Sequence, residues 1–357
     1  MAITFNNYIY IYLFAYLALP LCIFYKIKIL GNKSFNDNAF PKNHTDILRG
    51  IFIIIVVLAH TTARMPGTRY LLPLTLGGNL TNIIFLFLSG YCLMESLLNK
   101  TNYLKGFFSK KLVRVYVPFV IMNISLALFD GIVFKEYYAV KEFVVRTLLI
   151  KAVSNNSSLW YIIATLLLFT MFYISFKYLS KNSAMILMFM YAILYIIACE
   201  YLKLGVWWYN TAFCFPIGVF FSYNKQRLIT IIKEKYSMVL LVALLGSVIT
   251  FTSFVHNFRF NLIWNLTFTI FFILLIIIAM LKIELKSKIF TFIGGISYEL
   301  YLVHMALLLV YFRIINLRES YSFYLFLVIS IILSLGMKKI TSHKYALIHQ
   351  KSVSKSG

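Results

Sequence analysis

The sequence is poor in acidic residues and in charge of any kind. Only 11 of its 357 residues are Asp or Glu, and charged residues together make up 13% of the chain, about half the share found in an average soluble domain. Hydrophobic residues make up 61%. This composition excludes a soluble globular protein and is typical of a chain that crosses a membrane several times.

Cysteine and nucleotide-binding motifs are also scarce. The four cysteines lie in apolar runs without CxxC spacing, so the sequence predicts neither a disulfide framework nor a zinc site. Neither GxxxxGK[ST] nor GxGxxG occurs, which argues against the phosphate-binding loops that carry those patterns. We therefore expect no metal and no nucleotide held in these ways.

Apolar runs long enough to cross a bilayer as helices recur along the whole chain. They lack the alternation of a lipid-facing strand, so we predict an all-α polytopic membrane protein, a bundle of about 10–11 transmembrane helices. The predicted spans are 8–25, 47–64, 79–98, 115–134, 159–176, 183–202, 206–222, 236–255, 260–281, 289–312 and 322–337.

The formal net charge of +23 would suggest a nucleic-acid partner in a soluble protein. Most of the 34 Lys and Arg, however, fall in alternate loops, after the odd-numbered spans. The positive-inside rule then places the N-terminus outside, and the C-terminal tail, 341–357, in the cytoplasm. We expect the basic loops to contact anionic lipid. We expect the whole of 1–357 to form one integral-membrane domain.

The second span, "DILRGIFIIIVVLAH", places charged side chains inside hydrocarbon. Arg49 and His60 are eleven residues apart, which is almost three helical turns and roughly 16 Å along the axis. Both therefore project from one face, and Asp46 lies on that face within reach of Arg49. Such a stripe is costly in lipid, so we expect a polar cavity with Arg49 near its mouth and His60 deeper.

Several roles are open to these residues. A neutral His60 can take a proton from an attacking hydroxyl, relay a proton, or carry an acyl group. In the structural alternative, Arg49 anchors the topology by snorkelling and His60 is a hydrogen-bonded packing residue.

The tenth span, "FTFIGGISYELYLVHMALLLVYF", carries a second polar cluster with Tyr298, Tyr301 and His304. Gly294 and Gly295 precede it and permit close backbone approach. His304 lies fourteen residues beyond Phe290, as His60 lies fourteen beyond Asp46, so both should sit about 21 Å from the same boundary. The two histidines could then line one cavity. An internal hydrogen-bond network is the alternative.

The segment "FFSKKLVRVYVPF" contains a basic cluster in which Lys110 and Lys111 precede Arg114 by one helical turn. Lys and Arg are the natural partners of phosphate groups, so this cluster could hold the phosphates of a coenzyme. It could equally be a stop-transfer signal.

Together, "RGIFIIIVVLAH", "FLFLSGYCLMESLLN", "FFSKKLVRVYVPF", "SSLWYIIATLLL" and "GGISYELYLVH" resemble, in order, the landmarks of the acyltransferase-3 family of bacterial integral-membrane acyltransferases. The resemblance implies transfer of an acyl group, commonly acetyl from cytoplasmic acetyl-CoA, to a hydroxyl of a surface carbohydrate or its lipid-linked precursor. It implies that His60 is catalytic and that Arg49 and Arg114 serve the acyl donor. It also implies that the protein lies in the inner membrane of the cell. Because the family core has ten spans, the resemblance further implies that 1–30 carries an extra N-terminal span.

Two other classes of function stay open. An exporter of a polysaccharide intermediate could use the polar cavity as a pathway, but would be expected to carry paired, interrupted half-helices or an inverted repeat, and the sequence indicates neither. A non-catalytic component of a polysaccharide assembly would not need His60.

Overall fold

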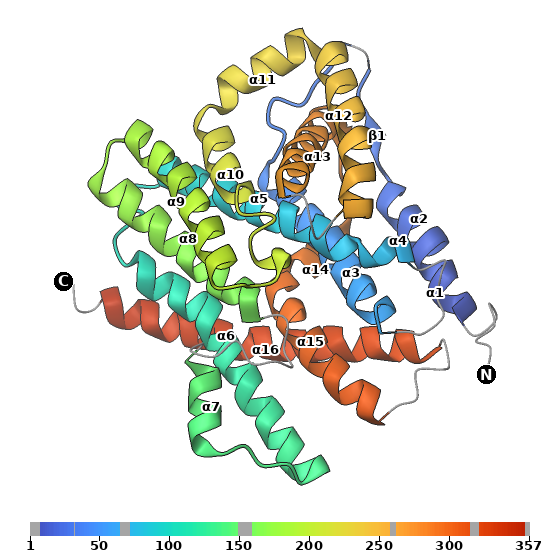
Figure 1. Ribbon diagram of the computed structural model, residues 1–357, viewed down its shortest axis with the longest axis vertical. Coiled ribbons are helices and arrows are strands. Elements are labelled where there is room, and N and C mark those ends of the chain that lie inside the picture. The colour runs from blue at the N-terminus through green and yellow to red at the C-terminus, as the bar shows by residue number, and fades with distance from the viewer. Residues whose placement is uncertain are drawn as a thin grey trace.

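The structure is a computed structural model that describes residues 8–31, 33–64, 72–148, 159–257, 262–314 and 321–353. Helices dominate it (Figure 1). Their bounds are α1 Ile9–Leu13, α2 Leu19–Phe24, α3 Lys42–Thr62, α4 Leu72–Thr75, α5 Gly77–Asn99, α6 Phe107–Phe129, α7 Val140–Thr147, α8 Leu159–Tyr178, α9 Lys181–Tyr201, α10 Cys214–Tyr223, α11 Lys225–Glu234, α12 Tyr236–Asn257, α13 Leu262–Lys282, α14 Lys288–Gly295, α15 Ser297–Ile314 and α16 Tyr321–Val353. Short turns of other helical types are η2 Phe14–Ala18, η4 Asp130–Phe134 and η5 Val206–Trp208.

The all-α polytopic class is confirmed. Within the described ranges, 7 helices are long and apolar enough to cross a membrane, and the bent pair α14–α15 can form an eighth span. The segments Ile9–Phe24, Cys214–Tyr223 and Tyr236–Phe251 are apolar but shorter. Each of the eleven predicted spans thus contains an apolar helical segment, and in three of them this segment is shorter than the roughly 20 residues that a full crossing needs.

The tenth predicted span, 289–312, is not one straight helix. α14 and α15 meet at an angle of 71°. Ser287 caps the start of α14 by accepting a hydrogen bond from the backbone N–H of Phe290 at 3.3 Å. A break leaves the last carbonyls of a helix without partners in that helix. Here the Lys338 ammonium of α16 donates to the carbonyl of Gly295 at 2.8 Å.

Glycines allow two pairs of helices to cross with their backbones in contact. A methyl group at Gly294 in α14 would lie 1.8 Å from the carbonyl oxygen of Asp46 in α3, and one at Gly50 would lie 2.0 Å from that of Phe290. Gly90 of α5 and Gly218 of α10 meet the opposite helix in the same way. Such crossings of small residues are how helices in membranes pack closely, and α3 is thereby fixed against the broken helix.

The connection between α2 and α3 is tied to the far end of α13. Strand β1 (Lys28–Ile29) pairs antiparallel with β2 (Ile283–Glu284), with Lys28 opposite Glu284. The buried Lys282 ammonium donates to the carbonyls of Gly31 and Ser34 at 2.8 and 2.9 Å. This two-residue ladder is the strand pairing that the described residues contain, and it does not alter the all-α class.

Two segments that the sequence places outside the spans are also helical. In the predicted polar stretch 135–157, α7 covers Val140–Thr147, while 149–157 lie outside the described residues. The predicted tail, 341–357, continues α16 without a break as far as Val353, and 354–357 are not described. The tail therefore extends the last span as one helix.

Candidate functional site

A cavity of about 1020 Å³ opens between α3, α5, α6, α8, the α14–α15 break and α16. Its volume is at the upper end of the range for ligand sites in proteins. Six of the residues singled out from the sequence line it: Asp46, Arg49, Lys111, Arg114, Tyr298 and Tyr301. Segments from Asn38 to Ser342 thus converge on one cavity.

Basic side chains dominate the charge of this cavity. Among the described lining residues, seven are Lys or Arg and three are Asp or Glu. Basic residues that only set the membrane topology can be spread over exposed loops. Basic residues that surround one cavity also raise the local concentration of anions there. The cavity is therefore suited to a negatively charged ligand.

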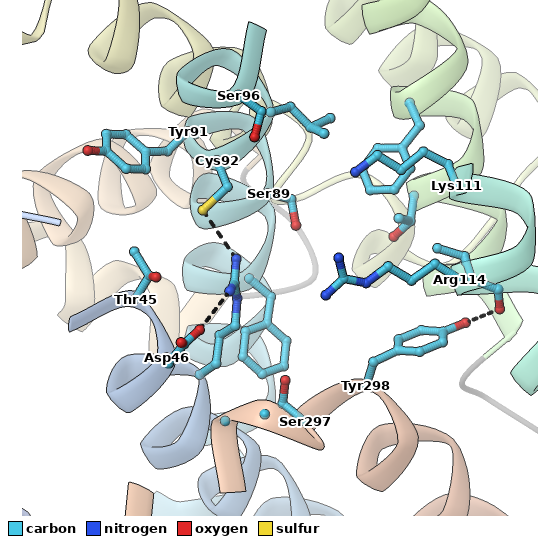
Figure 2. Close-up of a pocket in the computed structure, with 18 of the residues that line it drawn as sticks. Thr45, Asp46, Ser89, Tyr91, Cys92, Ser96, Lys111, Arg114, Ser297 and Tyr298 are labelled. Carbon is cyan, nitrogen blue, oxygen red and sulfur yellow. Dashed lines mark hydrogen bonds and ion pairs between the residues drawn. The ribbon is translucent and has the colours of Figure 1, made fainter. Parts of the chain in front are cut away.

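Arg49 is held in place on the α3 wall from two directions. One guanidinium nitrogen lies 3.4 Å from a carboxylate oxygen of Asp46, and another lies 3.3 Å from the sulfur of Cys92 on α5; dashed lines mark both contacts in Figure 2. The ion pair is partly solvated, with side chains 28% and 24% exposed, so it adds no more than about 1 kcal/mol of stability. Its main consequence is to orient the guanidinium.

Lys111 and Arg114 stand one turn apart on α6 and project into the cavity opposite Asp46 and Cys92 (Figure 2). The Lys111 ammonium lies over the rings of Phe107 and Phe169, 5.5 and 5.2 Å from their centroids. Neither cation forms an ion pair with an acidic side chain of the described chain. Both keep hydrogen-bond donors for a ligand.

The two tyrosines of the second polar cluster form part of the cavity wall. The Tyr298 hydroxyl donates to the carbonyl of Val115 at 2.6 Å, which fastens α15 to α6 beside Arg114 (Figure 2). Tyr301 packs on Tyr161 of α8 with ring centroids 5.1 Å apart. Both of these rings are buried, so they form an aromatic floor at the inner end of the cavity.

His60 and His304 meet beyond that floor. Their ring centroids are 5.4 Å apart, and His304 contacts Tyr301 edge to face at 5.8 Å. The two histidines therefore lie side by side, as expected, although the residue count from Phe290 runs across the bend between α14 and α15. Neither histidine is among the described residues that line the cavity. The expected single cavity from Arg49 to His60 is interrupted by Tyr161 and Tyr301.

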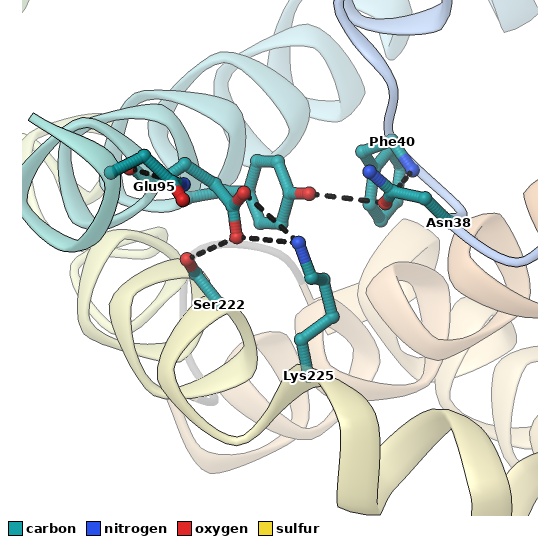
Figure 3. Close-up of polar contacts among 7 residues, drawn as sticks. Asn38, Phe40, Glu95, Ser222 and Lys225 are labelled. Carbon is teal, nitrogen blue, oxygen red and sulfur yellow. Dashed lines mark hydrogen bonds and ion pairs between the residues drawn. The ribbon is translucent and has the colours of Figure 1, made fainter.

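The structure adds residues that the sequence analysis did not assign to the site. Cys92 is one, and Glu95 on α5 is another: its carboxylate accepts from Lys225 at 2.8 and 2.9 Å and from the Ser222 hydroxyl at 2.9 Å (Figure 3). Glu95 lines the large cavity on one side and a smaller one of about 380 Å³ on the other. The sequence did indicate Glu95 as unusual, because it is an acidic residue inside an apolar span. Its partners could not be identified from the sequence, because they lie some 130 residues away.

No group of three or more His, Cys, Asp or Glu in the described part of the chain could hold a metal ion. The polar groups described above for this region include Lys and Arg side chains, hydroxyl groups and the two imidazole rings.

Comparison with protein families adds the decisive observation. The model of an acyltransferase domain, that of the acyltransferase-3 family, matches residues 44–338. The chain belongs to this family. Comparisons with curated proteins and with solved structures gave no match. The matched range spans α3 to α16 and contains every candidate residue named above, so this integral-membrane acyltransferase has the basic cavity and the histidine pair inside its family domain.

Proposed function

We propose that this acyltransferase moves an acyl group, acetyl in the first instance, from cytoplasmic acyl-CoA to a hydroxyl of a cell-surface carbohydrate or its lipid-linked precursor. The observation that carries the proposal is the basic cavity of 1020 Å³ at the centre of the family domain. In this proposal the protein resides in the inner membrane, and the cavity and the C-terminus face the cytoplasm, in keeping with the distribution of Lys and Arg.

The donor half of the proposal rests on Arg49, Lys111 and Arg114. Coenzyme A carries several phosphate groups, and guanidinium groups bind phosphate through paired, charge-assisted hydrogen bonds. Lys acts as a point charge toward the same groups. Arg49 approaches from α3 and the other two from α6, so they would hold the phosphates between opposite walls.

The proposed acyl-transfer step depends on His60. As general base, its imidazole takes the proton of the acceptor hydroxyl while the hydroxyl oxygen attacks the thioester carbonyl. When the tetrahedral intermediate collapses, the C–S bond breaks and the coenzyme leaves as a thiolate, which takes the proton from the imidazolium. A well-placed base contributes about 10²- to 10⁴-fold to such a step.

Reaching His60 requires the acyl end of the donor to pass Tyr161 and Tyr301. These rings separate the cavity from the histidine pair. Donor binding would therefore displace at least one ring, as closure and opening steps do in many enzymes.

One observation favours the second candidate, an exporter of a polysaccharide intermediate. The α14–α15 helix is broken, and interrupted helices line the substrate sites of many transporters. Those transporters carry such helices in pairs, in corresponding halves of the chain, and α14–α15 is the one bent pair that the described residues contain. The broken helix here lies against basic residues of the cavity, which also suits a donor site.

The proposal is tested with purified protein in detergent, labelled acetyl-CoA and a mixture of bacterial glycans. We expect label in the glycan fraction with wild type and its loss with His60→Ala and Arg49→Ala. Arg227→Ala, which removes an exposed arginine of α11 outside the large cavity, is the matched control and should retain activity. If the purified protein transfers no label, while cells need the protein to display a surface glycan and His60→Ala restores that display fully, the exporter would be favoured.

A further inference from the structure

His304 is completely buried, and one of its ring nitrogens has a fixed role. Nδ1 lies 2.8 Å from the carbonyl oxygen of Leu300, one turn earlier in α15. A carbonyl oxygen only accepts hydrogen bonds, so Nδ1 carries the proton and donates it. A neutral imidazole has a single N–H, and Nε2 therefore presents a lone pair.

That lone pair has no partner. Nε2 of His304 is buried and accepts no hydrogen bond from any described residue. Buried polar atoms are nearly always satisfied, and an orphan in a native fold requires an explanation. An unpaired buried nitrogen does not stabilise a histidine that only packs. A histidine that accepts a hydrogen bond from a neighbouring group needs such a nitrogen.

The neighbouring donor is His60. Its ring is tilted by 35° to that of His304, with the centroids 5.4 Å apart. α3, which carries His60, packs against α14 at Gly50 and Gly294 and also against α15, which carries His304. In the ring orientations of the structure Nε2 does not bond to His60, so a hydrogen bond between the two rings requires one of them to rotate.

We infer that His304 is a positioning residue whose Nε2 accepts a hydrogen bond from a ring N–H of His60. This bond holds His60 in one tautomer and leaves its other nitrogen with a free lone pair. The catalytic consequence rests on the function proposed above, whereas the hydrogen bond does not. Histidine suits the task here because a carboxylate in the same apolar surroundings would bury a full negative charge.

Two substitutions separate this role from packing. In His304→Gln, the side-chain carbonyl oxygen can take the place of Nε2 as acceptor. In His304→Asn, the shorter amide can still donate to Leu300, as Nδ1–H does, but leaves no acceptor near His60. Both variants keep a polar side chain of similar size in the same helix.

The first measurement uses the protein without substrate. Nitrogen-15 NMR of histidine-labelled protein at pH 8 reports the tautomer of each ring, and the His60 signals are assigned by their absence in His60→Ala. We expect a single His60 tautomer in wild type and His304→Gln, and a mixture in His304→Asn. The His304 Nε2 signal should also shift in His60→Ala, because its donor is lost.

The second measurement is acyl transfer. His304→Asn should lose about 10²-fold in kcat, the loss expected when a catalytic group is misplaced, while the KM for the donor stays near wild type because His304 does not line the cavity. His304→Gln should remain within about tenfold of wild type. The inference would be overturned if kcat fell equally in the two variants, or if the His60 tautomer were the same in wild type and in both variants. If wild type transfers no acyl group, the proposed function fails, and the NMR result still decides the hydrogen bond.

Discussion

A methyl group added at Gly294 tests the helix crossing that shapes the cavity. The new Cβ would lie 1.8 Å from the Asp46 carbonyl oxygen, and real Cβ atoms come no closer than about 3.0 Å. Both groups belong to helix backbones, so no side-chain rotation relieves the contact. In Gly294→Ala, α3 and α14 must therefore separate by roughly 1.2 Å.

This separation moves Arg49 away from Ser297 and Tyr298 on the other side of the crossing. Overpacking of this kind costs about 1–3 kcal/mol of stability, and a misplacement of about 1 Å in an active site can cost 10²-fold in rate. We expect a lower Tm in detergent and a fall in kcat/KM for the acyl donor of about that size. Thermal unfolding and the acyl-transfer assay measure the two effects.

Two other glycines provide graded controls. Gly336→Ala places its methyl group in open space on an exposed face of α16, and should leave activity unchanged and stability equal or up to about 1 kcal/mol higher. Gly295→Ala meets only the end of the Lys338 side chain, at 3.4 Å, and should have a small effect. If Gly294→Ala matches Gly336→Ala in both Tm and activity, the backbone contact does not shape the site.

Three further predictions concern charge, the aromatic floor and the ion pair between Glu136, which follows η4, and Arg313 of α15. Arg114→Ala should raise the Kd for acyl-CoA by about tenfold at low salt, as expected for one charge-assisted hydrogen bond, and by less at high salt; equal affinity at both salt concentrations would count against phosphate binding there. Tyr161→Ala opens the inner end of the cavity and should increase the transfer of longer acyl chains relative to acetyl, in a competition assay with mixed acyl-CoA donors. The Arg313 guanidinium, through its hydrogen bond, lowers the pKa of Glu136 below its ordinary value of 4.5, so the pair stabilises the fold above that pH and is lost as the pH falls below it. Glu136→Gln should lower Tm slightly at pH 7, and the difference from wild type should shrink as the pH falls below 4.5.

The sequence was sufficient to predict the helices because hydrocarbon thickness fixes the length of an apolar run. The break at Ile296 was not predictable by that rule. Apolar residues continue through Gly294 and Gly295 with no proline to end the helix, and the bend depends on Asp46 and Lys338, which approach from distant helices. The pairing of Lys28 with Glu284 is equally non-local.

The site was predictable where a polar side chain interrupts an apolar run. Arg49 and His60 were found because charge and imidazole are costly in lipid, and helical periodicity placed Asp46 beside Arg49. Their roles in acyl transfer stay predictions. The contact of Arg49 with Cys92 could not be foreseen, because cysteine is common in apolar helices and nothing in its spacing identifies a partner on another helix.

The spacing between Arg49 and His60 limits the donor that the proposed roles allow. α3 runs unbroken from Lys42 to Thr62, so the two residues are about 16 Å apart along its axis. If Arg49 holds a phosphate and His60 serves the reacting carbonyl, phosphate and acyl group must lie at opposite ends of a long molecule. An acyl phosphate, in which the two groups are directly bonded, cannot occupy both positions at once. A thioester at the end of a long, flexible arm can, and the uncharged surroundings of Tyr161 and Tyr301 suit that arm better than they suit a second anion. The separation of the basic cavity from the histidine pair therefore favours acyl-CoA over acyl phosphate as the donor.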